Sequence, residues 1–303
     1  MNADRAERPP VTLPRLAEMK EAGEPIVMVT AYDYPSARIA EEAGVDLVLV
    51  GDSAAVTVLG YSGTEPVSMD EMAMLGRAVR RGLRTPLMVG DMPMGSYEVS
   101  NEQAITSAQR LVKETGCQAV KLEGGGTSVD RSRAIVRAGI PVMGHVGLTP
   151  QSATALGGYR AQGRTAERAA QVAADALALQ SVGCFAIVFE AVPAAVTEEI
   201  VKRLEVPTIG IGAGPVTSGQ VLVFHDLLGI TEGHVPKFVR RYAEARRVML
   251  DGLRSYVRDV REHRFPGPEH VYSIEPAELA ELTRHLDQES LSSASSWDWE
   301  PLP

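Results

Sequence analysis

Short apolar runs, each ending on an ionisable residue or a glycine turn, recur six times along the chain. They cover residues 47–51, 87–90, 119–122, 142–144, 185–189 and 208–211, and they end on Asp52, Asp91, Glu123, His145, Glu190 and Gly212. Successive ends lie 39, 32, 22, 45 and 22 residues apart, which leaves room for a strand, a helix and two loops. Parallel strands with such crossovers place their carboxyl ends on one rim. The pattern predicts an α/β protein with parallel strands, and we infer a (β/α)8 TIM barrel, with an open doubly wound sheet as the alternative.

Amphipathic segments with helix-start and helix-stop residues alternate with these runs. They predict helices over residues 13–22, 35–43, 68–81, 101–115, 128–138 and 165–182. Ser68 and Glu71 form the pattern of a capping box, and Asn101 is expected to cap the helix that it opens. A first strand over residues 25–30 brings the strands that can be counted to seven.

The C-terminal part of the chain is less regular. An eighth strand is expected within residues 221–230, a segment that equally suits a helix followed by a short strand. Residues 237–256 are amphipathic and predict the last outer helix. Beyond Pro266 one more helix is predicted, followed by a serine-rich tail. We therefore expect a single catalytic barrel with an N-terminal helix over residues 1–265, and a C-terminal extension, helical and then disordered, over residues 266–303.

Composition excludes some classes of partner. The 303 residues are 45% apolar and carry a net charge of −9, which disfavours a nucleic-acid surface. No stretch approaches 18 apolar residues, so no membrane span is expected. The two cysteines, Cys117 and Cys184, each open an apolar strand, and the pattern indicates buried reduced thiols. We therefore expect a cytoplasmic protein.

Three carboxylates end successive predicted strands, namely Asp52, Asp91 and Glu123. Adjacent parallel strands lie about 5 Å apart, so these side chains converge and repel one another. A divalent cation relieves that repulsion, and oxygen ligands favour Mg²⁺ or Mn²⁺ over zinc. Helix capping, or pairing with arginine or lysine, is the alternative for each acid.

Three further residues of the rim suit chemistry. Lys121 lies two residues before Glu123, so strand alternation puts both on one face; it suits an oxyanion, a Schiff base or a structural ion pair. Glu190 ends a strand in an apolar mouth, which suits a general base, and pairing with a loop arginine is its alternative. His145 faces the same rim, as a functional group or as a satisfied core histidine.

Longer motifs give the chain a resemblance to a known family. From about residue 30 to about residue 242 it resembles the ketopantoate hydroxymethyltransferases, also called 3-methyl-2-oxobutanoate hydroxymethyltransferases. The segments that carry the resemblance are VTAYDYPSA, VLVGDSAAVTVLGY, GDMPMGSY, AVKLEGG, PVMGHVGLTPQSATALGGYRAQGRT, AIVFEAVPA, TIGIGAGP and GQVLVFHDLLGI. The pair GHVGLTPQ and LGGYRAQGRT is long and specific.

The resemblance implies a (β/α)8 barrel, dependence on Mg²⁺ and a homo-oligomer, often a decamer. It implies transfer of a hydroxymethyl group from 5,10-methylenetetrahydrofolate to 3-methyl-2-oxobutanoate through a Mg²⁺-stabilised enolate. The product is ketopantoate, on the route to pantothenate and coenzyme A.

The resemblance also implies roles for individual residues. Asp52 and Asp91 match the direct metal ligands, and Glu123 lies at or near the metal. Ser53 and Lys121 match residues that hold the oxo acid, and we add Asp91 and His145 to the candidate substrate contacts. Glu190 matches the base that removes the C3 proton.

The chain departs from the family pattern at a few places, and other functions are conceivable. Met94 stands where phenylalanine is frequent, Ser218 stands where aspartate is frequent, and residues 60–68 differ from the usual acid followed by small hydroxyl residues. One rival is a Mg²⁺-dependent carbon–carbon lyase of the phosphoenolpyruvate mutase and isocitrate lyase kind, whose catalytic-cysteine loop has no match here. A class I aldolase using Lys121 and a non-catalytic barrel are the others.

Overall fold

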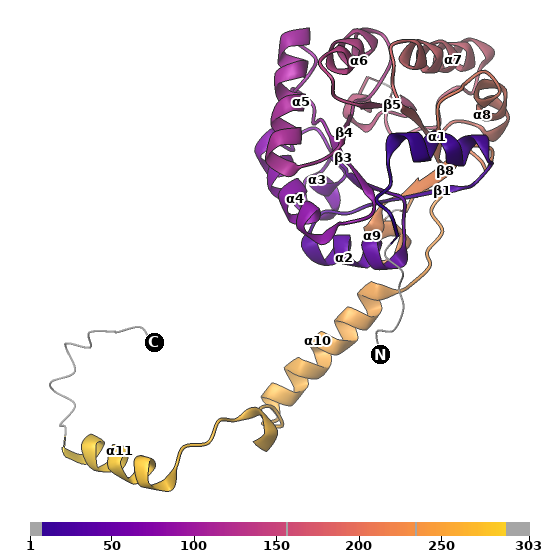
Figure 1. Ribbon diagram of the computed structural model, residues 1–303. Helices are drawn as coiled ribbons and strands as arrows, with labels where there is room; N and C mark the ends of the chain where they lie inside the picture. Colours follow the sequence, from indigo (N-terminus) through magenta and orange to yellow (C-terminus); the bar gives the residue numbers. More distant parts are fainter. Residues whose placement is uncertain (1–7, 156, 234, 289–303) are drawn as a thin grey trace. The chain divides into compact units, whose positions relative to one another are not determined.

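The computed structural model describes residues 8–155, 157–233 and 235–288, and in it eight parallel strands close into a barrel in chain order. Figure 1 shows the helices that connect these strands arranged around the barrel. The strands are β1 (Ile26–Thr30), β2 (Leu47–Val50), β3 (Leu87–Asp91), β4 (Ala119–Lys121), β5 (Val142–Gly147), β6 (Ala186–Glu190), β7 (Thr208–Ile211) and β8 (Gly219–Leu222). The predicted (β/α)8 fold is confirmed.

Most predicted helices are observed within two residues of their expected ends. The helices are α1 (Leu13–Glu21), α2 (Tyr34–Ala43), α3 (Ala54–Thr57), α4 (Met69–Gly82), α5 (Asn101–Thr115), α6 (Thr127–Arg137), α7 (Ala166–Ser181), α8 (Ala194–Val201), α9 (Phe224–Leu227), α10 (Ala245–Arg261) and α11 (Pro276–Gln288), with 3₁₀ turns η1 (Pro150–Ser152) and η2 (Pro268–His270). The capping box of Ser68 and Glu71 forms as predicted. The cap of α5 is Ser100, whose Oγ accepts from the Gln103 N–H at 3.1 Å, and not Asn101. None of the helices in the described ranges has both the length and the apolar content of a membrane span.

Strand alternation sorts the side chains into two buried clusters. One cluster fills the barrel interior with residues such as Leu47, Leu87 and Val188, and helix α1 contributes Leu16 and Met19 to it. The other lies between the outer faces of the strands and the helices. Because side chains alternate along a strand, the inward positions that follow the interior apolar residues carry the polar groups of the rim.

Two predictions about the C-terminal part of the chain are wrong in detail. The eighth strand, β8, lies mostly before the expected segment, and the short helix α9 follows it instead of preceding it. The last long helix, α10, begins at Ala245 rather than at residue 237, and none of its residues is buried. An amphipathic pattern reports an apolar face and not the surface against which that face packs.

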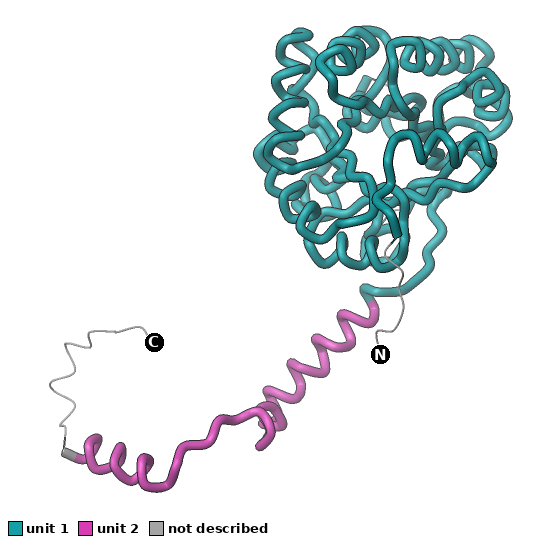
Figure 2. Tube along the Cα trace, in the orientation of Figure 1, with its two compact units in different colours: residues 1–246 teal, residues 247–303 magenta. Residues whose placement is uncertain are grey.

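The chain divides into two units, residues 1–246 and 247–303 (Figure 2). The first unit holds the complete barrel, and the second holds most of α10 together with α11, the helix predicted beyond Pro266. The serine-rich tail predicted to be disordered, residues 290–303, lies outside the described residues. The boundary that we placed after residue 265 stays a prediction.

Glycine is required at position 147, where β5 meets β6. Gly147 has φ of +94° and pairs with Glu190, and a Cβ added there would lie 2.3 Å from the Glu190 carbonyl oxygen. We expect Gly147→Ala to lower the free energy of unfolding by about 3 kcal/mol or more, from backbone strain and this clash together. Urea denaturation measures the loss.

Gly139→Ala is the matched control for that substitution. Gly139 has φ of +86° with nothing within 4 Å of an added Cβ, so only the backbone strain remains, about 1–2 kcal/mol. Equal losses in the two variants would contradict the role given to the contact between Gly147 and the Glu190 carbonyl.

Candidate active site

All of the predicted site residues line one cavity of about 330 Å³ at the carboxyl ends of the strands. They are Asp52, Ser53, Asp91, Lys121, Glu123, His145 and Glu190. Asp91 ends β3, Lys121 ends β4 and Glu190 ends β6, while Asp52 and Glu123 follow β2 and β4 by two residues. The strand ends thus bring together residues that are up to 138 positions apart in the sequence, from Asp52 to Glu190.

Asp52 and Asp91 are adjacent and buried. The backbone N–H of Asp52 donates to Asp91 Oδ2 at 3.1 Å, and the two residues are 4% and 1% exposed. Burial, reinforced by the Asp91 and Glu123 carboxylates, raises the pKa of Asp52 well above its usual range. Burial also raises the pKa of Asp91, although the Lys121 ammonium opposes it. This part of the site favours a bound cation.

Lys121 is a buried ammonium between two of these acids. Its Nζ donates to Asp91 Oδ1 at 2.6 Å and lies 3.4 Å from Glu123 Oε1. Burial alone would lower the pKa of Lys121, but the Asp91, Glu123 and Asp52 carboxylates outweigh it and raise the pKa. A lysine held as ammonium is a poor nucleophile, so its surroundings disfavour the Schiff base of a class I aldolase and suit the binding of an anionic oxygen.

His145 lies between two carboxylates on opposite sides of its ring. Its Nδ1 is 3.3 Å from Glu123 Oε1, and its Nε2 is 3.3 Å from Glu190 Oε2. Both pairs are close, but their angles fall short of aligned hydrogen bonds. Burial disfavours the imidazolium, yet Glu123 and Glu190 outweigh burial and raise the pKa of His145 to about 9. His145 therefore lies between Glu123, which follows β4, and Glu190, which ends β6.

Ser53 stands beside Asp52, and its hydroxyl is held by a tyrosine. Tyr32 Oη and Ser53 Oγ lie 2.8 Å apart, and burial raises the pKa of Tyr32 to about 12. The neutral phenol thus fixes the Ser53 hydroxyl at the cavity wall. Sequence reasoning did not assign Tyr32 to the site, although the residue lies within one of the family-like motifs, VTAYDYPSA.

Gln151 is a second residue that sequence reasoning missed. It lies in η1 after β5, is 7% exposed, and contacts both Asp52 and Glu123 through hydrogen bonds. The signal for it was present, since Gln151 ends the motif GHVGLTPQ.

The donor set fits a divalent cation. If the Asp52, Asp91, Glu123 and Glu190 carboxylates are ionised against the Lys121 and His145 cations, two negative charges remain. Within the described ranges no three acidic, histidine or cysteine side chains are grouped closely enough to enclose a metal ion. Mg²⁺ is commonly held by only one or two carboxylates, with substrate and water oxygens completing its shell. Asp52 and Asp91 meet that requirement.

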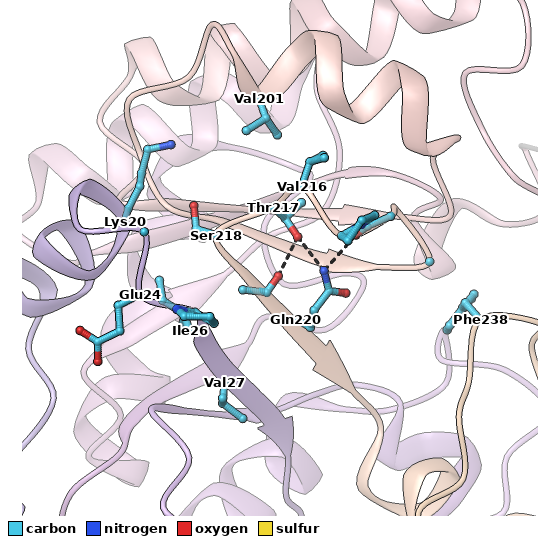
Figure 3. A pocket seen from close by; sticks show the side chains of 16 residues that line it. Lys20, Glu24, Ile26, Val27, Val201, Val216, Thr217, Ser218, Gln220 and Phe238 are labelled. Carbon is cyan, nitrogen blue, oxygen red and sulfur yellow. Dashed lines mark hydrogen bonds between the residues drawn. The ribbon is translucent and has the colours of Figure 1, made fainter.

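A larger cavity, of about 840 Å³, lies outside the barrel between residues of α1, α8 and the strands β1 and β8 (Figure 3). Its charged side chains are Lys20 and Glu24, and Gln220 Nε2 donates to Thr217 Oγ1 at 2.8 Å (Figure 3). None of the predicted site residues lines it. The predicted site residues therefore gather in the smaller cavity at the rim and not in this one.

Known structures resemble the chain in fold. Phosphonopyruvate hydrolase in complex with oxalate and Mg²⁺ matches with a TM-score of 0.57 at 13% identity, covering 91% of this chain and 95% of that structure. Oxaloacetate acetylhydrolase in complex with 3,3-difluorooxalacetate matches with a TM-score of 0.56 at 15% identity, covering 92% and 96%. At such identities the likeness concerns the fold alone.

Sequence relatives are much closer. The 3-methyl-2-oxobutanoate hydroxymethyltransferase of Moorella thermoacetica is 54% identical over 88% of this chain and 99% of its own length. That of Heliobacterium modesticaldum is 51% identical over 88% and 96%, and a mitochondrial one of Arabidopsis thaliana is 48% identical over 94% and 84%. The family model for ketopantoate hydroxymethyltransferase matches residues 10–268. These matches show that the chain belongs to the ketopantoate hydroxymethyltransferase family.

Proposed function

We propose that the chain transfers a hydroxymethyl group from 5,10-methylenetetrahydrofolate to 3-methyl-2-oxobutanoate, giving ketopantoate for pantothenate and coenzyme A synthesis. The observation that carries the proposal is one cavity at the barrel rim that holds two adjacent acids, an ammonium group and Glu190 together. The relatives that share about half of their residues with the chain bear the name of this activity.

The acids would hold Mg²⁺. Asp52 and Asp91 are the proposed direct ligands. Glu123 lies beside them, and its carboxylate is already paired with Lys121 and His145. Mg²⁺ bound there would act as a Lewis acid on the oxo acid and make its C3–H bond more acidic.

The remaining residues would bind the substrate and move its proton. Lys121 offers its ammonium to the anionic oxygens, and Ser53 offers a hydroxyl fixed by Tyr32. Glu190 is the proposed base for the C3 proton, and His145, 3.3 Å from its carboxylate, orients it. The activated carbon would attack the methylene iminium formed from the folate, and hydrolysis by water would then release the hydroxymethyl product and tetrahydrofolate.

The lyase alternative requires a catalytic cysteine in a loop above the barrel. Both cysteines of this chain are buried and free, at 3% and 1% exposure, and neither Cys117 nor Cys184 lines the cavity. The same burial of reduced thiols supports the proposed cytoplasmic location.

A homo-oligomer, a decamer by resemblance, is part of the proposal. On α10 the residues Met249, Leu253, Tyr256 and Val260 share one face at helical spacing, and all four are at least 41% exposed. Such an apolar face favours association with further copies. A monomeric mass in sedimentation equilibrium would contradict this part.

Isotope exchange at C3 of 3-methyl-2-oxobutanoate, measured with and without Mg²⁺ and without folate, tests the proposal. We expect the exchange to depend on Mg²⁺, because Glu190 lies in the same cavity as the proposed metal ligands Asp52 and Asp91. An enzyme that neither exchanges this proton nor forms ketopantoate when methylenetetrahydrofolate is added would contradict the assignment.

A further inference from the structure

Gln151 connects two of the proposed metal-site acids through its side chain and its backbone. Its Nε2 donates to Asp52 Oδ2 at 2.9 Å, and its backbone N–H donates to Glu123 Oε2 at 3.0 Å. We propose that Gln151, held by Tyr97, is a positioning residue that fixes the Asp52 carboxylate for metal binding. This inference rests on the proposed function, in which Asp52 is a metal ligand.

The neighbours of Gln151 allow one orientation of its amide. Nε2 faces two acceptors, Asp52 Oδ2 and the Met92 carbonyl oxygen at 3.0 Å. Oε1 faces a donor, the Tyr97 hydroxyl at 2.6 Å. Turning the amide over would place its oxygen against a carboxylate and a carbonyl, so three partners together decide which end faces Asp52.

Tyr97 is itself fixed. It is 3% exposed, and its carbonyl oxygen accepts from Arg131 Nε at 3.1 Å. Arg131 also donates to the side chain of Asn101, at the start of α5, at 2.6 Å. The chain of contacts therefore runs from α6, which carries Arg131, through Tyr97 and Gln151 to the acid at the end of β2.

This arrangement leaves one oxygen of Asp52 for a metal. Gln151 occupies Oδ2, and among the described residues no hydrogen bond is made to Oδ1. A rotating carboxylate would lose entropy on binding a cation, whereas a carboxylate held by one oxygen loses less. Residues that donate hydrogen bonds to a metal ligand commonly strengthen metal binding by about 10–100-fold. Gln151 makes such a hydrogen bond to Asp52.

The test uses the full chain and Mn²⁺, whose free concentration is followed by electron paramagnetic resonance. Gln151→Met keeps the length of the side chain and removes its polar atoms. We expect the Mn²⁺ dissociation constant to rise by about 10–100-fold. At saturating metal, C3 exchange should return to within a few-fold of the unmodified chain, because no group that touches the substrate is changed.

Two further variants separate positioning from a purely structural role. Tyr97→Phe removes only the hydroxyl that orients the amide, and we expect a several-fold rise in the same dissociation constant. Gln118→Met is the matched control, since Gln118 Oε1 accepts from the Met88 N–H at 3.0 Å away from the cavity. It should leave Mn²⁺ affinity unchanged.

The outcomes distinguish a positioning role of Gln151 from a purely structural one. Unchanged Mn²⁺ affinity in Gln151→Met, with a lower melting temperature, would make Gln151 merely structural and overturn the inference. If Gln151→Met does not fold, unchanged affinity in Tyr97→Phe overturns it instead. An unmodified chain that binds Mn²⁺ but fails to exchange the C3 proton or to form ketopantoate would contradict the proposed function and leave the role of Gln151 standing.

Discussion

Replacing Glu190 by glutamine is expected to lower the rate of C3 proton exchange by about 10²–10⁴-fold, the usual contribution of a positioned general base. The amide has nearly the shape of the carboxylate and remains within reach of His145 Nε2, 3.3 Å from the present oxygen. It cannot accept the substrate proton. Mn²⁺ affinity should change little, because Asp91 ends β3 and Asp52 follows β2, and the substitution on β6 leaves both unchanged.

The control for Glu190→Gln is a glutamate that does not line the cavity. Glu198, on the outer helix α8, pairs with Lys202 at 3.4 Å and is more than half exposed. Glu198→Gln should exchange the C3 proton at the unmodified rate. If Glu190→Gln did the same, Glu190 would not be the base, and the assignment of proton removal would have to move to another group.

The convergence of these residues was predictable because it follows from backbone geometry. Alternation puts Lys121 and Glu123 on one face, and parallel pairing sets Asp91 beside Lys121 in adjacent strands. Neither step depends on knowing how the side chains pack. The order of residues along β3 and β4 was therefore enough to place three charged groups at one rim.

Two features were not predictable, each for a physical reason. Gln151 follows a proline in a 3₁₀ turn, where no repeating pattern of polar and apolar positions shows which way a side chain points. The apolar face of α10 looks the same in sequence whether the helix packs on the barrel of its own chain or on another copy. The observed helix, with no buried residue, was therefore expected as an ordinary outer helix over residues 237–256.

Replacing Asp52 by asparagine is expected to weaken Mg²⁺ binding by at least about 100-fold and to stabilise the metal-free protein. The asparagine oxygen still accepts from Gln151, so the packing is kept. Burial and the nearby carboxylates of Asp91 and Glu123 raise the pKa of Asp52, which means that the folded protein disfavours the ionised form of Asp52 more than the unfolded chain does. Removing that charge relieves a repulsion that the Lys121 ammonium offsets only in part and that a bound cation would offset further.

Urea denaturation with and without Mg²⁺ measures both effects of Asp52→Asn. A ligand at 100 times its dissociation constant stabilises the folded state by about 2.7 kcal/mol, so the unmodified chain should gain stability with Mg²⁺ and the variant should gain almost none. Asp175→Asn is the control, because burial also raises the pKa of Asp175 and this residue does not line the barrel cavity. It should keep the response to Mg²⁺. If Asp52→Asn still gained the full stabilisation from Mg²⁺, Asp52 would not be a metal ligand. If Asp52→Asn alone lost that stabilisation and was the more stable protein without metal, the Asp52 charge would bind the cation and destabilise the metal-free fold.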